Sequence, residues 1–273
     1  MSDGSNQLSA ELFYRNPLRV GEAKPAFGLE EPDPSRPDHA GHMAQIVDGR
    51  DTATSLEQEG FKLLQHSSSV ADFYDDQCVQ DQYYPEIKEL VSRESGAAFV
   101  QVLSHITRSE EQALQGKRLG AHRLVHNDFT SNLIKDGFFA ALEEEGKYDM
   151  ENGRICIFNL WRRFDKDGLD TPFAVCDKRT VSEEELIPTD LYNYIGDEPQ
   201  GLTVEIYQSA HNEDHEWYFY PKMNRDEVLM FKTYDSLDKP FLPTLHSAFD
   251  DPSLKKKASP RESIEVRAVC FYN

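Results

Sequence analysis

The sequence lacks the features of several large protein classes. It contains no run of about 18 apolar residues, the length that a membrane-spanning helix needs. Its first residues lack the basic start and apolar core of a secretory signal peptide. The four cysteines include no C-x-x-C pair, which excludes the common zinc and thiol redox motifs. We therefore expect a soluble cytoplasmic protein with free thiols.

Basic residues are scarce relative to acidic ones. The 273 residues include 29 Lys and Arg against 49 Asp and Glu, and the formal net charge is -20. Such a charge repels phosphate backbones and argues against nucleic-acid binding. With no membrane segment either, we expect a small-molecule substrate as the partner and a monomer or homodimer as the working unit.

The first 50 residues show no sustained helical or strand period. They are rich in proline and charge, as in EEPDPSRPDHAGH, and predict an extended N-terminal arm over residues 1–50. His39 and His42 lie here, but a nearby proline and glycine disfavour a helix that would align the two imidazoles. We interpret both as solvated loop histidines. Residues 51–273 are expected to form a single domain that begins with helices.

A strand-rich pattern dominates the rest of the chain. Helical spacing is limited to residues 69–73, 85–95 and 132–145. β-Branched and aromatic residues recur in about eight segments joined by short turns. The clearest segments are AAFVQVLSHITR, RICIFNLWRRF, LTVEIYQSA, DEVLMFKTYDS and ESIEVRAVCFYN. This rhythm predicts a mostly β fold with peripheral helices and a double-stranded β-helix core, the jelly-roll or cupin-like architecture.

His126 and Asp128 are the first candidates for a functional site. On an extended strand, residues two apart point to the same face, so an imidazole and a carboxylate can take adjacent positions on a divalent metal. One more histidine from a distant strand would complete the 2-His-1-carboxylate triad of non-haem Fe(II) oxygenases. A surface histidine beside a loop aspartate is the alternative interpretation.

The third ligand is expected near the C-terminus, on the next-to-last strand of the jelly roll. His246 in FLPTLHSAFDDP has this position and is the favoured candidate. His215 and His211 are the alternatives, and they flank the turn in SAHNEDHEW. A hydrogen-bonded core histidine is the other interpretation of His246.

The last strand carries cations on one face. Arg261, Ser263, Glu265 and Arg267 share one parity, whereas the residues between them are apolar. An arginine fork binds a carboxylate through two parallel hydrogen bonds, as a dicarboxylic co-substrate requires. Arg261-x-Ser263 has the Arg-x-Ser form of many 2-oxoglutarate oxygenases, and Arg267, deeper in the strand, is its slightly favoured rival. A solvated outer face of charges is the alternative.

Other polar residues are assigned from their strand. Asn159 and Trp161 share a face of the strand expected beside the metal strand, so one would hydrogen-bond the co-substrate while the other packs over it. Ordinary core packing of Trp161 is the alternative. Arg162 and Lys232 are further cations that would hold the co-substrate if the last strand does not.

A resemblance to a known family is carried by an ordered set of motifs, namely HNDFTSN, IFNLWRRF, FAVCD, IPTDLYN, HEWYFYPKM, DEVLMFKTYDS, LHSAFDDP and PRESIEVRAVCFY. From about Ile46 onward the chain resembles the fungal and bacterial hydroxylases and desaturases related to the 7α-cephem-methoxylase companion chain. The resemblance implies a jelly-roll oxygenase with Fe(II) on His126, Asp128 and a later histidine. It also implies 2-oxoglutarate on a C-terminal arginine, and O₂ as the oxidant.

The function implied by this resemblance is oxidation of a C–H bond in a small natural-product or amino-acid-derived substrate. Hydroxylation, desaturation and oxidative ring formation are the expected outcomes within such a family. A non-catalytic cupin-like module that binds a small acidic ligand is the alternative. A zinc hydrolase built on His126 and Asp128 is disfavoured, because no second carboxylate motif accompanies them.

Overall fold

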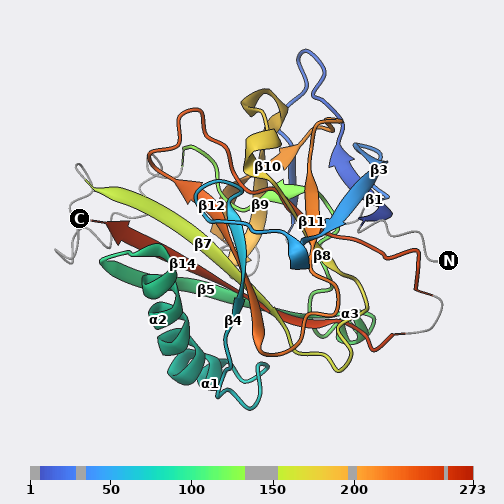
Figure 1. Ribbon diagram of the computed structural model, residues 1–273. Coiled ribbons are helices and arrows are strands. Elements are labelled where there is room, and N and C mark those ends of the chain that lie inside the picture. The colour runs from blue at the N-terminus through green and yellow to red at the C-terminus, as the bar shows by residue number, and fades with distance from the viewer. Residues whose placement is uncertain (1–6, 29–34, 133–152, 196–201, 255–257, 273) are drawn as a thin grey trace.

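Two β-sheets face each other across a buried interior (Figure 1). The computed structural model describes residues 7–28, 35–132, 153–195, 202–254 and 258–272. The helix predicted over residues 132–145 lies outside these residues, apart from Asn132.

The larger sheet has nine strands among the described residues, in the order β1-β3-β11-β8-β13-β6-β10-β9-β2. In chain order they are β1 (Gln7–Arg15), β2 (Ala26–Gly28), β3 (His39–Asp48), β6 (His126–Asn127), β8 (Phe173–Cys176), β9 (Leu186–Ile195), β10 (Leu202–Ser209), β11 (Trp217–Phe219) and β13 (His246–Ala248). The antiparallel pairing of β13 with β6 places His246 opposite His126. Two histidines that are far apart in the sequence thereby meet near the middle of the sheet.

The smaller sheet has the order β4-β12-β7-β14-β5. Its strands are β4 (Phe61–Gln65), β5 (Phe99–Ser109), β7 (Arg154–Arg163), β12 (Glu227–Asp235) and β14 (Glu262–Tyr272). The long strands β7, β14 and β5 cross the molecule side by side (Figure 1). In the pairing of β14 with β7, Arg267 lies opposite Asn159 and Glu265 lies opposite Trp161.

The helices lie outside the sheets. They are α1 (Asp76–Cys78), the π-helical turn η2 (Val79–Tyr83), α2 (Tyr84–Ser95), α3 (Glu110–Ala113) and the 3-10 turns η1 (Gly49–Asp51), η3 (Lys178–Thr180) and η4 (Glu183–Glu185). The apolar face of α2 packs on the outer face of the smaller sheet. The helix expected over residues 69–73 is wrong: the helical segment begins at Asp76, because Asp75 accepts the hydrogen bonds of the first backbone N–H groups.

The inner faces of the two sheets are apolar on either side of a polar centre. Along β7, Ile157 belongs to one buried apolar cluster and Trp161 to another, and Asn159 lies between them. The polar face predicted for the last strand also points inward, since Arg261, Ser263 and Arg267 are all buried. A solvated outer face of charges is therefore ruled out for these three residues.

Much of the expected N-terminal arm is part of the larger sheet. β1 pairs antiparallel with β3, and β3 pairs parallel with β11. Ala10, Leu12 and Tyr14 are buried and alternate with more exposed neighbours. This two-residue period is a strand signal that the proline-rich composition of the region concealed. The division of the chain into an arm over 1–50 and a domain over 51–273 stays a prediction.

The interpretation of His39 and His42 as solvated loop histidines is wrong. Both lie on β3, and His39 is buried between the amide of Gln208 and the carboxylate of Asp38. His42 stacks on His211, with 3.9 Å between the ring centres.

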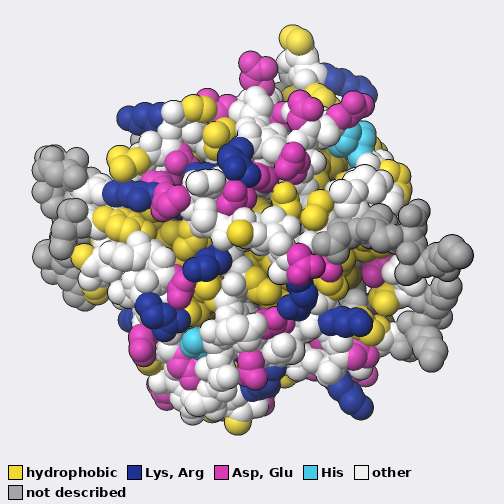
Figure 2. Space-filling model, in the orientation of Figure 1, with side chains coloured by type: hydrophobic (Ala, Val, Ile, Leu, Met, Phe, Trp, Pro, Cys, Tyr) yellow, Lys and Arg dark blue, Asp and Glu magenta, His cyan; other side chains and the backbone are white. Residues whose placement is uncertain are grey.

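The surface carries charged side chains of both signs. On the face shown in Figure 2, acidic and basic side chains are interspersed, and Lys and Arg do not gather into one patch. Within the described parts of the chain, no helix has the length and apolar character needed to cross a bilayer.

Candidate metal centre

His126, Asp128 and His246 come together between the two sheets. His126 begins β6, Asp128 follows that strand, and His246 begins β13. All three are buried, and one ligand atom from each lies within 4.8 Å of the others. The Nε2 atoms of His126 and His246 lie 3.5 Å and 3.7 Å from Asp128 Oδ1. The structure therefore groups the three residues that the sequence predicted as metal ligands.

Both imidazoles are held in the tautomer that a metal needs. His126 Nδ1 lies 2.7 Å from the carbonyl of Leu124, and His246 Nδ1 lies 3.1 Å from the carbonyl of Thr244. A carbonyl oxygen only accepts, so each Nδ1 carries the proton and each Nε2 keeps its lone pair. In the described part of the chain, His246 Nε2 is buried without a hydrogen-bond partner. A metal bond would satisfy this atom.

Asp128 offers one oxygen to the imidazoles because its other oxygen is held from the opposite sheet. Asp128 Oδ2 accepts hydrogen bonds from Arg267 Nε at 2.6 Å and from Asn159 Nδ2 at 2.7 Å. Burial alone would raise the pKa of Asp128, but the Arg267 guanidinium and the two imidazoles hold it well below its usual range. The carboxylate is therefore ionised at neutral pH.

The three side chains suit a divalent transition metal. Burial lowers the pKa of His126, and the neighbouring His246 lowers it further, so the imidazole is neutral as a metal ligand must be. Metal bonds of about 2.1 Å at right angles place ligand atoms about 3 Å apart. Two imidazoles and one carboxylate are the donor set of non-haem Fe(II) sites.

Arg267 and Asn159 each donate hydrogen bonds to both Asp128 and Glu265. Arg267 Nη2 donates to Glu265 Oε1 at 2.8 Å, and Asn159 Nδ2 donates to the same oxygen at 3.0 Å. The Asn159 carbonyl oxygen accepts from Thr233 Oγ1 at 3.2 Å. These contacts use the polar groups that the sequence assigned to the co-substrate.

Arg261 is a buried cation with a different environment. Its side chain is 2% exposed, and its guanidinium carbon lies 4.9 Å from the ring centre of Trp161. Its Nε donates to Ser263 Oγ at 3.1 Å, and its Nη1 donates to the carbonyl of Thr171 at 3.2 Å. Burial lowers the pKa of Arg261 to about 9. Within the described chain, no carboxylate forms an ion pair with this guanidinium, so it is well placed for an anionic ligand.

Trp161 packs beside this cation. Its ring stacks on Phe173 with 4.8 Å between centres and 11° between planes. Its Nε1 is buried and has no hydrogen-bond partner among the residues described. The side chain therefore combines the core packing and the free polar donor that the sequence left as alternatives.

The alternative third ligands lie elsewhere. His215 Nε2 contacts Glu185 Oε2 at 2.8 Å, and His215 Nδ1 contacts the hydroxyl of Tyr14 at 3.1 Å. His211 stacks on His42. Neither residue joins the group of His126, Asp128 and His246.

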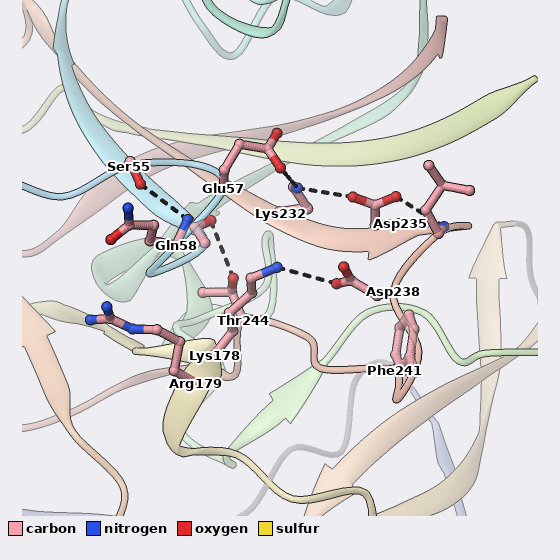
Figure 3. A network of polar contacts seen from close by, with 12 residues as sticks. Ser55, Glu57, Gln58, Lys178, Arg179, Lys232, Asp235, Asp238, Phe241 and Thr244 are labelled. Carbon is pink, nitrogen blue, oxygen red and sulfur yellow. Dashed lines mark hydrogen bonds and ion pairs between the residues drawn. The ribbon is translucent and has the colours of Figure 1, made fainter.

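The alternative cations for the co-substrate, Lys232 and Arg162, also have partners within the protein. Figure 3 shows Lys232 between Glu57 and Asp235, at 3.2 Å and 3.0 Å from their carboxylates. Arg162 donates to the hydroxyl of Tyr83 and to the carbonyl of His66. In the same network Thr244 Oγ1 donates to the Gly60 carbonyl at 3.2 Å (Figure 3). This contact fixes the residue whose carbonyl orients His246.

Two polar residues near the ligands were not singled out from the sequence. The ring centre of His122 lies 4.1 Å from that of His126. Arg108 lies opposite Ser263 in the pairing of β5 with β14. His122 has the same parity as His126, and this could have indicated that the two side chains lie on one face of an extended segment. Arg108 ends a predicted strand and gave no signal of its own.

Known proteins match nearly the whole chain. A family model described as "YDMC: Oxidoreductase/YMDC permease-like domain" matches residues 12–271. The alpha-ketoglutarate-dependent dioxygenase phiK of a fungal species is 30% identical over 84% of this chain and 83% of its own length. The Fe(II)/2-oxoglutarate-dependent dioxygenase nvfI of Aspergillus novofumigatus is 30% identical over 96% of this chain and 91% of its own length. The hydroxylase/desaturase efuI of Hormonema carpetanum is 31% identical, over 80% and 79%.

A solved structure has the same fold. The iron and alpha-ketoglutarate-dependent endoperoxidase NvfI matches with a TM-score of 0.83 at 26% identity, over 98% of this chain and 99% of that one. Together with the two facing sheets, this match confirms the jelly-roll fold predicted from the sequence.

Proposed function

Since this chain belongs to the family of non-haem Fe(II)/2-oxoglutarate-dependent dioxygenases, it is an oxidoreductase that uses Fe(II), 2-oxoglutarate and O₂, and we propose that His126, Asp128 and His246 hold the iron. The observation that carries the proposal is the meeting of two imidazole Nε2 atoms and one carboxylate oxygen in a buried place. Bound Fe(II), with 2-oxoglutarate and O₂, supplies the oxidising power to remove hydrogen from a C–H bond.

Arg267 and Asn159 are proposed as positioning residues for Asp128. Their hydrogen bonds hold Oδ2, so that Oδ1 alone faces the two imidazoles. The Leu124 and Thr244 carbonyls orient the imidazoles in the same way. Such supporting hydrogen bonds fix the ligand atoms before the metal arrives.

Arg261 and Ser263 are proposed to hold the distal carboxylate of 2-oxoglutarate. Arg261 has no carboxylate of the described chain as a partner, whereas Arg267 donates to Asp128 and Glu265. This reverses the slight preference that the sequence gave to Arg267. The indole N–H of Trp161, which lacks a partner in the described chain, is a further donor for the co-substrate.

The substrate is proposed to be a small natural-product or amino-acid-derived molecule. The relatives are named as dioxygenases, hydroxylases, desaturases and an endoperoxidase, so hydroxylation, desaturation and oxidative ring formation are the candidate outcomes. The apolar clusters on both sides of Asn159 keep water from the reacting atoms.

The surroundings in which the protein works are also proposed. We propose a cytoplasmic monomer or homodimer that has no nucleic-acid or membrane partner. The net charge of -20 supports the exclusion of nucleic acid. The four free cysteines suit a reducing compartment.

Anaerobic mixing with Fe(II) and 2-oxoglutarate tests this function. The account predicts a weak visible charge-transfer band that forms only when both are present, and succinate on admission of air and substrate. A cupin-like module that merely binds acidic ligands would bind 2-oxoglutarate without this band. Stoichiometric iron binding with no band would contradict the proposal.

A further inference from the structure

Arg108 is a second guanidinium, half-buried, that forms no ion pair with a described carboxylate. Its Nη1 donates to the carbonyl of Gly120 at 2.7 Å, and no ion pair joins it to an acidic residue of the described chain. Partial burial lowers the pKa of Arg108, whereas the carboxylates of Glu265 and Asp128 raise it and the guanidinium of Arg267 lowers it. Arg108 lies opposite Ser263 in the pairing of β5 with β14, which places it on the inner face of the smaller sheet, within the enclosure between the two sheets.

His122 adds an unpartnered polar atom to this enclosure. The side chain is 7% exposed, and within the described chain its Nε2 is buried without a hydrogen-bond partner. Its ring lies against that of His126, and the Gly120 carbonyl that Arg108 contacts lies two residues before it in the chain. A buried polar atom costs free energy until a partner satisfies it.

The ion pairs around the centre show which cation has no carboxylate partner in the described chain. Arg267 is balanced by Glu265, and the positive charge of Arg261 together with that of Fe(II) is balanced by Asp128 and the two carboxylates of 2-oxoglutarate. Glu110, which also acts on Arg108, is held by Arg123 at 2.9 Å. Arg123 is shared with the exposed Asp250, and Arg108 itself forms no ion pair with a carboxylate of the described chain.

We propose that Arg108 and His122 are the specificity-determining residues of the substrate pocket, and that they bind a carboxylate or other anionic oxygen of the substrate beside the iron. The inference rests on the proposed function and deepens it, because it assigns the substrate to the class of organic acids. Arg108 supplies a two-pronged charged donor, and His122 supplies a hydrogen bond to the same oxygen group.

The test uses octanoate as the probe and octanamide as its uncharged counterpart. Each is titrated calorimetrically into the anaerobic wild-type protein loaded with Fe(II) and saturating 2-oxoglutarate. We expect octanoate to bind at least tenfold more tightly than octanamide. Arg108→Gln should remove this preference and leave the 2-oxoglutarate dissociation constant, measured from the charge-transfer band, within about twofold of wild type.

Further variants separate recognition from folding. Arg108→Lys keeps the charge and should lose only part of the preference, and His122→Phe should weaken octanoate binding while iron stays bound. Arg118→Gln is the matched control, because Arg118 is a neighbouring half-buried cation that donates to Thr107 and lies over Tyr74. It should bind octanoate like wild type.

Three results would overturn the inference. They are equal binding of octanoate and octanamide to wild type, an unchanged preference in Arg108→Gln, and a tenfold loss of 2-oxoglutarate affinity in that variant. The last result would make Arg108 a co-substrate residue. Failure of the proposed function looks different, because the wild-type protein would then give no charge-transfer band with Fe(II) and 2-oxoglutarate.

Discussion

The two carboxylate oxygens of Asp128 have different partners, and this asymmetry defines the centre at the residue scale. One oxygen faces two imidazoles, and the other accepts hydrogen bonds from Arg267 and Asn159. A carboxylate held in this way would offer a single oxygen to the proposed iron, which would leave positions for co-substrate and O₂.

Lengthening this side chain should be as damaging as removing it. Asp128→Glu moves the carboxylate by about one methylene, which exceeds the tolerance of about 0.2 Å for metal bonds. We expect the variant to be folded by circular dichroism but to bind iron at least tenfold more weakly in a competition assay with a chelator. Iron affinity equal to wild type would contradict the role of Asp128.

Substitution by lysine should have different effects at Arg261 and Arg267, the two arginines of β14. Arg261→Lys keeps the charge but loses the fork, so the 2-oxoglutarate affinity should fall by about tenfold to a hundredfold, as expected for one charged hydrogen bond. Ser263→Ala should show a smaller loss of the same kind. Arg267→Lys should instead weaken iron binding. Titrations of 2-oxoglutarate and of Fe(II) on each variant check this, and the opposite pattern would restore the sequence-based preference.

These residues also show how much of the candidate site can be predicted from the sequence. The H-x-D spacing and the position of His246 were sufficient to predict that His126, Asp128 and His246 lie together, because strand parity and strand order determine which side chains meet. The parity of β14 predicted its polar inner face. The choice between Arg261 and Arg267 depends on the pairing of β14 with β7 and on contacts with Asp128, and no pattern within one strand contains that information.

At the scale of elements, the strand that carries His246 is held by contacts with the start of β4. Thr244 donates to the Gly60 carbonyl through its hydroxyl and to the Lys232 carbonyl through its backbone N–H. Gly60 has φ +92°, and a Cβ built there would lie 2.3 Å from Thr244 Oγ1. A side chain at Gly60 must therefore displace the residue that orients His246.

Gly60→Ala should lower both stability and iron affinity. Backbone strain and the clash together should cost about 1–3 kcal/mol of unfolding free energy. Gly116→Ala is the matched control, because Gly116 has φ +65° but nothing within 4 Å of its added Cβ. Urea unfolding and an iron titration on both variants are the measurements. Equal iron affinity in the two variants would show that Gly60 does not support the centre.

The buried pair of Lys232 and Asp235 in Figure 3 predicts a pH dependence. Burial alone would raise the pKa of Asp235, but Arg154 and Lys232 hold it below its ordinary value. A carboxyl whose folded-state pKa is depressed stabilises the fold above its unfolded pKa of about 3.9, and this stabilisation is lost as the pH falls towards the folded pKa. The group therefore contributes fully at pH 7.

Asp235→Asn should lower the unfolding free energy at pH 7 by about 3 kcal/mol, because the buried Lys232 then keeps only the exposed carboxylate of Glu57 as its ion-pair partner among the described residues. The difference from wild type should shrink below about pH 4. Asp250→Asn removes an exposed carboxylate and should have little effect at either pH. Urea unfolding of each variant at pH 7 and pH 3 is the measurement. A difference in unfolding free energy between Asp235→Asn and wild type that grows in acid would contradict the depressed pKa of Asp235.

The N-terminal strands show why element-level prediction failed in one place. Alternation at Ala10, Leu12 and Tyr14 is as clear as in the predicted strands. The adjacent proline-rich stretch outweighed it, because composition averages over a window while a strand needs only a few alternating residues. β1 and β3 extend the larger sheet, so this part of the chain belongs to the fold.

At the scale of the whole molecule, the net charge of -20 opposes compaction. Salt screens repulsion between surface charges over about 10 Å at 0.1 M. We expect the melting temperature at pH 7 to rise by about 2–4 °C when NaCl increases from low to physiological concentration. The rise should vanish near the isoelectric point. A fall in melting temperature at pH 7 would show that local ion pairs dominate instead.

Iron content of ligand variants tests the central claim most directly. After anaerobic loading and desalting, wild type and His215→Ala should each retain about one Fe(II) per chain. His126→Ala, Asp128→Ala and His246→Ala should retain almost none, while their circular dichroism spectra stay those of a folded protein. Iron retained by His246→Ala and lost by His215→Ala would contradict the account.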